Sequence, residues 1–186
     1  MRIIGGEHRG IALTPVGKGD AGAHLRPTTD RTRESLFNVL LGGRFGDPID
    51  GVRVLDLFAG TGALGLEALS RGAAHVTLVD NGRVAQRLIR DNIAKLRRQA
   101  DCTLLATAAD RLPPAPTPCG LVFLDPPYGK GMGEKALTAA AQAGWIAGDA
   151  LIVWEESSPQ EAPDGFDMIE TRRYGDTHIS FLRCRV

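Results

Sequence analysis

The sequence has few cysteines, no long apolar run and no excess of charge of one sign. Cys102, Cys119 and Cys184 stand far apart among 186 residues, and no Cys-x-x-Cys pair occurs. We therefore expect neither a disulfide framework nor a metal site. Apolar runs such as 150–154 are too short to span a bilayer, and the N-terminus lacks an apolar signal core. These absences predict a cytoplasmic protein that does not associate with membranes.

The lack of net charge gives no sign of a nucleic-acid-binding protein, because 22 Lys and Arg residues balance 22 Asp and Glu residues. The charges are unevenly distributed, however. Residues 83–98 hold six basic side chains and only Asp91 as an acid, whereas residues 149–170 hold seven acids and no Lys or Arg. Both stretches are typical of solvated surfaces, and the basic one could also contact a nucleic-acid backbone. We assign no role to the acidic segment 155–167.

The length fits one domain, residues 1–186, and the pattern predicts an α/β fold. From residue 52 onward strands and helices alternate, which predicts a mostly parallel, Rossmann-like sheet with helices on both faces. Residues 168–173 and 178–184 break this rhythm and predict an antiparallel hairpin at one edge. The other predicted strands are 52–57, 75–79, 102–106, 121–124 and 150–154, and the helices between them are 63–70, 84–98 and 134–143.

An N-terminal extension, residues 1–45, precedes the predicted core of residues 50–186. Ile3-Ile4 and the segment 11–13 are β-prone and flank several glycines, which predicts a small hairpin. Residues 28–41 predict a helix, with Thr and Asp as N-cap candidates and an apolar face.

A glycine-rich turn follows the first predicted strand, in the run Asp56-Leu57-Phe58-Ala59-Gly60-Thr61-Gly62. Open α/β sheets bind ligands beyond the carboxyl ends of their strands, and glycine lets the backbone approach a ligand closely. The glycines also fit the G-x-G-x-x-G pattern, and Asp80 lies twenty positions after Gly60, so a NAD-dependent oxidoreductase remains an alternative. Asp56 argues against it, because this carboxylate would repel a pyrophosphate but can accept a hydrogen bond from a cationic amino group.

A second motif, Asp125-Pro126-Pro127-Tyr128, ends the predicted strand 121–124. Two consecutive prolines fix two φ angles and give a stiff turn. The Asp125 carboxylate and the Pro126 carbonyl can each accept a hydrogen bond from an exocyclic amine, and Tyr128 can stack on a flipped base. Asp125 could also take up the released proton. A rigid surface turn is the alternative, but the position at a strand end favours a ligand site.

These two motifs resemble motifs I and IV of class I S-adenosyl-L-methionine methyltransferases that act on amino groups. Within this resemblance, Asp80 matches the acid that binds the ribose hydroxyls, and Asp110 matches the acid near the adenine amino group. The resemblance implies S-adenosyl-L-methionine as cofactor and Asp125, Pro126, Pro127 and Tyr128 as catalytic residues. It assigns the cofactor site to Asp56, Phe58, Ala59, Gly60, Thr61, Gly62, Asp80, Asn81, Asp110 and Arg111.

Segments along nearly the whole chain resemble the RsmD family of bacterial ribosomal RNA methyltransferases. The matching segments are residues 2–6, 26–38, 56–65, 69–73, 125–128 and 174–177. The resemblance implies an enzyme that methylates guanine N2 in 16S ribosomal RNA, within a small-subunit assembly intermediate, and nothing in the sequence demands more than a monomer. The residues themselves support RNA contacts in the N-terminal extension, where our candidates are Arg26, Thr28, Arg31 and Arg33. An arginine cluster at a helix start is equally typical of a solvated face.

Four alternatives remain open at this stage. A DNA adenine-N6 methyltransferase usually needs a target-recognition region, for which this chain has little room. A protein glutamine-N5 methyltransferase typically has Asn where Asp125 stands. A NAD-dependent oxidoreductase and a non-catalytic ribosome-assembly factor belong to different classes. In each enzymatic case, the glycine-heavy run 129–133 predicts a loop that closes over the substrate.

Overall fold

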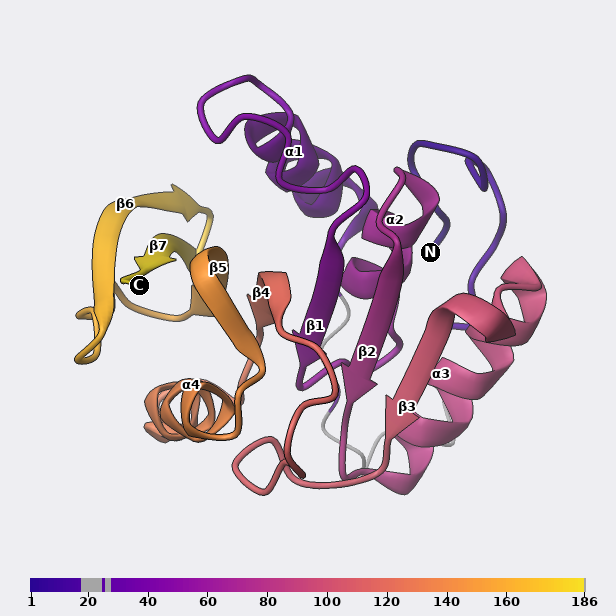
Figure 1. The fold of residues 1–186 in the computed structure, drawn as a ribbon. Helices are drawn as coiled ribbons and strands as arrows, with labels where there is room; N and C mark the ends of the chain where they lie inside the picture. The colour runs from indigo at the N-terminus through magenta and orange to yellow at the C-terminus, as the bar shows by residue number, and fades with distance from the viewer. Residues whose placement is uncertain (18–24, 26–27, 186) are drawn as a thin grey trace.

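The computed structural model describes residues 1–17, 25 and 28–185. Their core is a seven-stranded sheet with the order β3-β2-β1-β4-β5-β7-β6 (Figure 1). The strands are β1 (Arg53–Leu57), β2 (His75–Val79), β3 (Cys102–Leu105), β4 (Cys119–Leu124), β5 (Ile146–Glu156), β6 (Phe166–Tyr174) and β7 (Thr177–Cys184). The α-helices are α1 (Asp30–Leu40), α2 (Ala63–Ser70), α3 (Arg83–Leu96) and α4 (Met132–Gln142). Among these helices, none has the length and apolarity needed to cross a membrane.

The predicted topology is confirmed. Strands β1 to β5 pair in parallel, and β7 pairs antiparallel with both β5 and β6. The hairpin therefore inserts β7 between β5 and the edge strand β6. Strand β5 starts earlier than predicted, because the polar Gly148-Asp149 pair lies inside it at an irregularity where the register with β4 shifts. Asp149 takes a positive φ of 62° there, which interrupts the apolar pattern without ending the strand.

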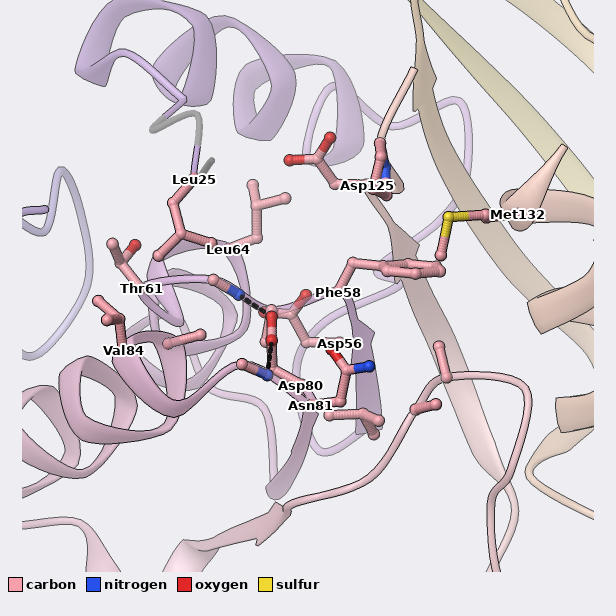
Figure 2. Close-up of a pocket in the computed structure, with 18 of the residues that line it drawn as sticks. Leu25, Asp56, Phe58, Thr61, Leu64, Asp80, Asn81, Val84, Asp125 and Met132 are labelled. Carbon is pink, nitrogen blue, oxygen red and sulfur yellow. Dashed lines mark hydrogen bonds between the residues drawn. The ribbon is translucent and has the colours of Figure 1, made fainter. Parts of the chain in front are cut away.

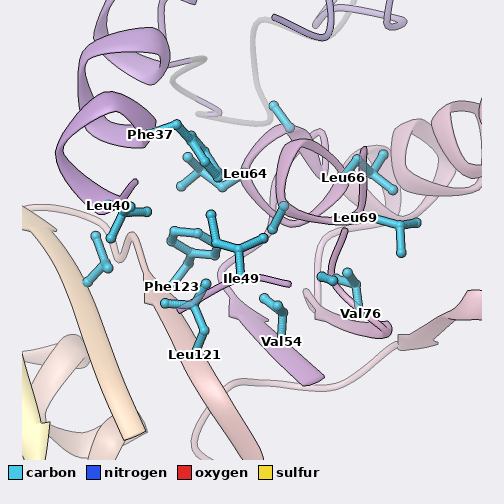
Figure 3. Packing of buried hydrophobic residues seen from close by; sticks show 14 of the residues in the cluster. Phe37, Leu40, Ile49, Val54, Leu64, Leu66, Leu69, Val76, Leu121 and Phe123 are labelled. Carbon is cyan, nitrogen blue, oxygen red and sulfur yellow. The ribbon is translucent and has the colours of Figure 1, made fainter. Parts of the chain in front are cut away.

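Helices cover both faces of the sheet, as predicted, but unequally. On one face, α1, α2 and α3 bury a continuous cluster, in which Phe37 of α1 meets Phe123 of β4 at a ring-centroid distance of 5.8 Å (Figure 3). On the other face, α4 packs alone and the segment 106–118 takes the place of a second helix. Each large side chain buried in this way contributes about 1.5–3 kcal/mol to stability.

The N-terminal extension forms the predicted hairpin as a short pairing rather than as full strands. The Ile3 N–H donates to the Ile11 carbonyl at 2.9 Å, and the Leu13 N–H donates to the Met1 carbonyl at 3.0 Å. Helix α1 begins two residues later than predicted because Thr29 caps it, accepting the Thr32 N–H with its side chain.

Candidate active site

A cavity of about 830 Å³ opens where the carboxyl ends of β1, β2 and β4 meet (Figure 2). Both predicted motifs contribute to its wall although they lie far apart in the sequence. Its apolar side chains include Leu64, Val84 and Met132, which no motif predicted. Of the predicted residues, those that line it are Thr28, Asp56, Phe58, Ala59, Gly60, Thr61, Asp80, Asn81, Asp110, Asp125, Pro127 and Tyr128.

The glycine loop adopts backbone angles that few residues tolerate. Gly60 has a φ of 61°, Gly62 has a φ of 82°, and Phe58 has a φ of 58° despite its side chain. A non-glycine residue in the left-handed backbone conformation is strained by about 1–3 kcal/mol, and residues strained in this way are frequent in ligand-binding loops. A Cβ built on Gly60 would meet no atom within 4 Å, whereas one on Gly62 would lie 3.1 Å from Leu78. Gly62 does not line the cavity and instead forms the N-cap of α2.

Asp56 lies beneath this loop and fastens it to α2. The side chain is 1% exposed, and its Oδ2 accepts the Gly65 N–H at 2.9 Å. A Cβ on Gly65 would lie 2.9 Å from the same oxygen, so the helix can approach the carboxylate only because residue 65 is glycine. Burial raises the pKa of Asp56 to about 8; the hydrogen bond from Gly65 opposes this shift and the charge of Asp80 adds to it.

Asp80 ties the end of β2 to two neighbouring segments. Its Oδ2 accepts the Gly60 N–H at 3.0 Å, and its Oδ1 accepts the Gly82 N–H at 2.9 Å, as the dashed lines in Figure 2 show. Each carboxylate oxygen accepts about two hydrogen bonds, so Asp80 can hold the loop and a ligand hydroxyl together.

The segment after β3 contributes Asp110 to the cavity wall but not Arg111. Both side chains are exposed. The Arg111 N–H donates to the Ala108 carbonyl at 3.0 Å, and its carbonyl accepts the Thr107 hydroxyl at 3.2 Å, which closes a local turn. The prediction that Arg111 contacts a cofactor therefore has no support from its position.

The motif Asp125–Tyr128 is anchored on both sides. The Asp125 N–H donates to the carbonyl of Leu57 at the end of β1, at 3.5 Å. The Tyr128 hydroxyl donates to Glu155 Oε1 at 2.8 Å. Pro126 is buried, whereas Pro127 is exposed on the cavity wall. The predicted loop 129–133 is shorter than expected, because α4 already begins at Met132.

The predicted RNA contacts are separated by the structure. Arg31 is exposed on the first turn of α1, Thr28 lines the cavity, and Arg26 lies outside the described residues. The prediction for Arg33 is wrong, since its side chain is 0% exposed and cannot reach a phosphate. Its position three residues before Leu36, on the apolar face of the helix, was the sequence signal for burial.

Arg33 instead belongs to a buried ionic cluster. Its Nε lies 3.3 Å from Glu67 Oε1, and its Nη2 lies 2.9 Å from Asp30 Oδ1. Glu67 is also 0% exposed and accepts the N–H groups of Ile4 and Gly5, each at 2.9 Å. The cluster thus fixes the N-terminal hairpin and α1 to helix α2, whose first turn belongs to the cavity.

Asn92 is a site-supporting residue that the motifs did not reveal. It is fully buried on α3, where its Nδ2 donates to the Thr61 carbonyl at 2.9 Å and its Oδ1 accepts the Thr14 N–H at 2.6 Å. It therefore connects the glycine loop to the N-terminal extension. The available signal was a polar side chain within the apolar stripe of Leu88, Ile89, Ile93 and Leu96.

The strand order, the glycine loop after β1 and the acid at the end of β2 together define the class I methyltransferase fold. The solved structure of the Escherichia coli protein yhhF matches with a TM-score of 0.83 at 35% identity, covering 100% of this chain and 98% of that one. The family profile described as "Conserved hypothetical protein 95" matches residues 1–183. The chain belongs to this family, the RsmD family.

Relatives from two bacterial species share one name, and both are similar to this chain over most of its length. "Ribosomal RNA small subunit methyltransferase D" of Escherichia coli strain K12 is 43% identical over 164 residues, which cover 88% of this chain and 78% of the relative. The protein of that name from Haemophilus influenzae is 33% identical over 181 residues, covering 94% of this chain and 89% of the relative.

Proposed function

We propose that this protein is an S-adenosyl-L-methionine-dependent methyltransferase that methylates the exocyclic N2 amine of a guanine in 16S ribosomal RNA, within a small-subunit assembly intermediate. The observation that carries the proposal is the convergence of the Asp125–Tyr128 motif, the glycine loop and Asp80 on one cavity. The names of the relatives support ribosomal RNA as the substrate. The assignment of guanine N2 rests on the family resemblance.

The cavity fits S-adenosyl-L-methionine better than a dinucleotide. The space beside Gly60, which a Cβ would enter without contact, leaves room for a ligand against the backbone. Asp80 and Asp110 line the wall near the glycine loop and suit a ligand with ammonium and sulfonium charges. Asp56 lines the same wall, and although burial raises its pKa to about 8, a cationic ligand would favour its ionised form. Asp80 would hold the ribose hydroxyls and Asp110 the adenine amino group. When bound, this cofactor supplies an activated methyl group.

The motif Asp125–Tyr128 would position the methyl acceptor. The Asp125 carboxylate and the Pro126 carbonyl are the proposed acceptors for the two N–H groups of the amine, and Tyr128 would stack on the base. Because the methyl group is already activated, the chain needs to align the reactants rather than to deprotonate the amine first. Asp125 lies at the cavity wall, where it can also receive the proton that is lost after transfer.

The charges around the cavity suit a polyanion that delivers one base. The wall of the cavity also holds three basic side chains, those of Arg83, Lys130 and Lys135. Arg31 is exposed on α1, three residues after Thr28, which lines the cavity. Cations can contact the flanking phosphates while the base itself enters the cavity. We retain Arg26, Thr28 and Arg31 as proposed RNA contacts and propose that the enzyme acts as a monomer.

The decisive experiment measures transfer of labelled methyl groups to undermethylated small ribosomal subunits. We expect label in the RNA with the wild type, and a loss of at least about a hundredfold with Asp125→Ala, as for other positioning groups. Asp164→Ala, which removes an exposed acid between β5 and β6, is the matched control and keeps full activity. Label in ribosomal protein instead of RNA, transfer to DNA when DNA is offered in place of the subunits, or thermal stabilisation by NAD and not by S-adenosyl-L-methionine, would contradict the proposal.

A further inference from the structure

The hydroxyl of Tyr128 lies between two segments that belong to the edge of the sheet. It donates to Glu155 Oε1 of β5 at 2.8 Å, and it lies 3.2 Å from the Oγ1 of Thr177, the first residue of β7. All three side chains are partly buried. The tyrosine ring is therefore held at two points. Its Cβ joins it to the backbone of the motif, and its hydroxyl joins it to β5 and β7.

The antiparallel hairpin explains why Thr177 reaches this point. Strand β5 ends at the cavity side of the sheet, like the other parallel strands, and β7 pairs with it in the opposite direction, with Glu155 opposite Ile179 and Glu156 opposite His178. The first residue of β7 must therefore lie beside the end of β5. If β7 ran parallel to β5, its last residue would lie beside the end of β5, and Thr177 would lie at the opposite edge of the sheet.

We propose that Glu155 and Thr177 are positioning residues that hold the Tyr128 ring in the orientation needed to stack on the target base. The inference rests on the proposed function, in which Tyr128 contacts that base. A phenol hydroxyl has one donor and can also accept. The Glu155 carboxylate accepts the hydrogen bond that the Tyr128 hydroxyl donates, which leaves the Tyr128 hydroxyl oxygen to accept a hydrogen bond from Thr177. A ring fixed before the base arrives loses less conformational freedom when it stacks.

The test is a double-mutant cycle between Tyr128→Phe, which keeps the ring, and Thr177→Val, which keeps the shape of residue 177. We expect each single variant to lower kcat/KM for the small subunit by about fivefold, the usual range for one lost hydrogen bond. The KM for S-adenosyl-L-methionine should stay at the wild-type value, and the melting temperature should fall by no more than about 2–4 °C, the shift expected for one lost hydrogen bond in a chain of this length. The double variant should be no worse than Tyr128→Phe, because Thr177 acts through the hydroxyl that Phe lacks.

Two further variants separate positioning from a general structural role. Glu155→Gln keeps an acceptor oxygen and should retain most of the activity, whereas Glu155→Ala should lose as much as Tyr128→Phe. Thr171→Val makes the same chemical change as Thr177→Val on the same hairpin, but its hydroxyl bonds Ser180 at 3.0 Å instead of Tyr128. This control should keep wild-type kcat/KM.

The outcomes distinguish this inference from the proposed function. If Tyr128→Ala abolishes methylation but Thr177→Val is fully active, or if its effect simply adds to that of Tyr128→Phe, the positioning role is wrong and the proposed function stands. If Tyr128→Ala is fully active, the stacking role of Tyr128 and this inference are both wrong, while methyl transfer to RNA stands. If the wild type transfers no methyl group to RNA, the proposed function itself is overturned.

Discussion

At the scale of single residues, Asp56 combines a structural and an electrostatic role. One of its oxygens holds the first turn of α2 through Gly65, and the same carboxylate lies on the wall of the cavity. Burial keeps its pKa near 8, far above the ordinary value of 3.8. A ligand with a positive charge would favour the ionised form, so ligand binding and the protonation of Asp56 should be linked.

This pKa predicts the pH dependence of stability. Between about pH 4 and pH 8 the unfolded chain has lost the Asp56 proton while the folded protein keeps it, so this group makes the protein less stable as pH rises. The slope is at most about 1.4 kcal/mol per pH unit. Asp56→Asn cannot titrate, and denaturant unfolding at several pH values should show wild type losing stability relative to this variant up to about pH 8. A constant difference between the two proteins would contradict the assigned pKa.

At the scale of secondary-structure elements, the buried ionic cluster joins the N-terminal extension to α2. Arg33 and Glu67 are both fully buried, and Glu67 also accepts two backbone N–H groups of the hairpin. Arg71 also pairs with Glu67 at 2.9 Å, so removing Arg33 leaves this buried carboxylate with a single cationic side chain and less compensation for its charge. The extension is thus bound to the core by a few contacts of buried groups, while Arg31, two residues before Arg33 on α1, is exposed to solvent.

A pair of neighbouring arginines tests this division. Arg33→Ala should destabilise the protein by about 3–5 kcal/mol, because Glu67 stays buried with less compensation. Arg31→Glu should change stability by less than about 0.5 kcal/mol but weaken binding to the small subunit, with little effect on cofactor affinity. Chemical denaturation and a binding titration measure both effects. Equal stability losses, or unchanged RNA affinity in Arg31→Glu, would contradict the assignments.

Asn92 links α3 to the glycine loop and to the N-terminal extension. We therefore expect its substitution to weaken cofactor binding from a distance. Asn92→Leu fills the space but makes neither hydrogen bond, leaving the Thr61 carbonyl and the Thr14 N–H without this partner. We expect S-adenosyl-L-methionine affinity, measured by calorimetry, to fall by about fivefold, since the one lost bond to the glycine loop, at the Thr61 carbonyl, is worth about 1 kcal/mol. The exposed neighbour Asp91 provides the control, Asp91→Ala. Wild-type cofactor affinity in Asn92→Leu would show that the loop does not depend on this residue.

At the scale of the whole molecule, the alternation of strand and helix patterns predicted the sheet, and the break in that alternation predicted the edge hairpin. The two motifs each follow a predicted strand, which placed them at the carboxyl edge of the sheet. These features follow local rules, because strand period, glycine turns and proline pairs are visible in the sequence. Roles set by tertiary packing were not visible. The helical spacing could place Arg33 on a buried face, but the sequence could not show that its partner there is Glu67, or that Asn92 reaches Thr61. Each depends on residues distant in the chain.

Identification of the methylated nucleoside decides whether the cavity acts on the N2 amine of guanine. Small subunits labelled by the wild-type protein are digested, and the nucleosides are separated by mass spectrometry. We predict N2-methylguanosine as the labelled product, and we expect none of it when Asp125→Ala replaces the wild type. Label in a methylated adenosine, or at another position of guanosine, would contradict the assignment of the cavity to the N2 amine of guanine.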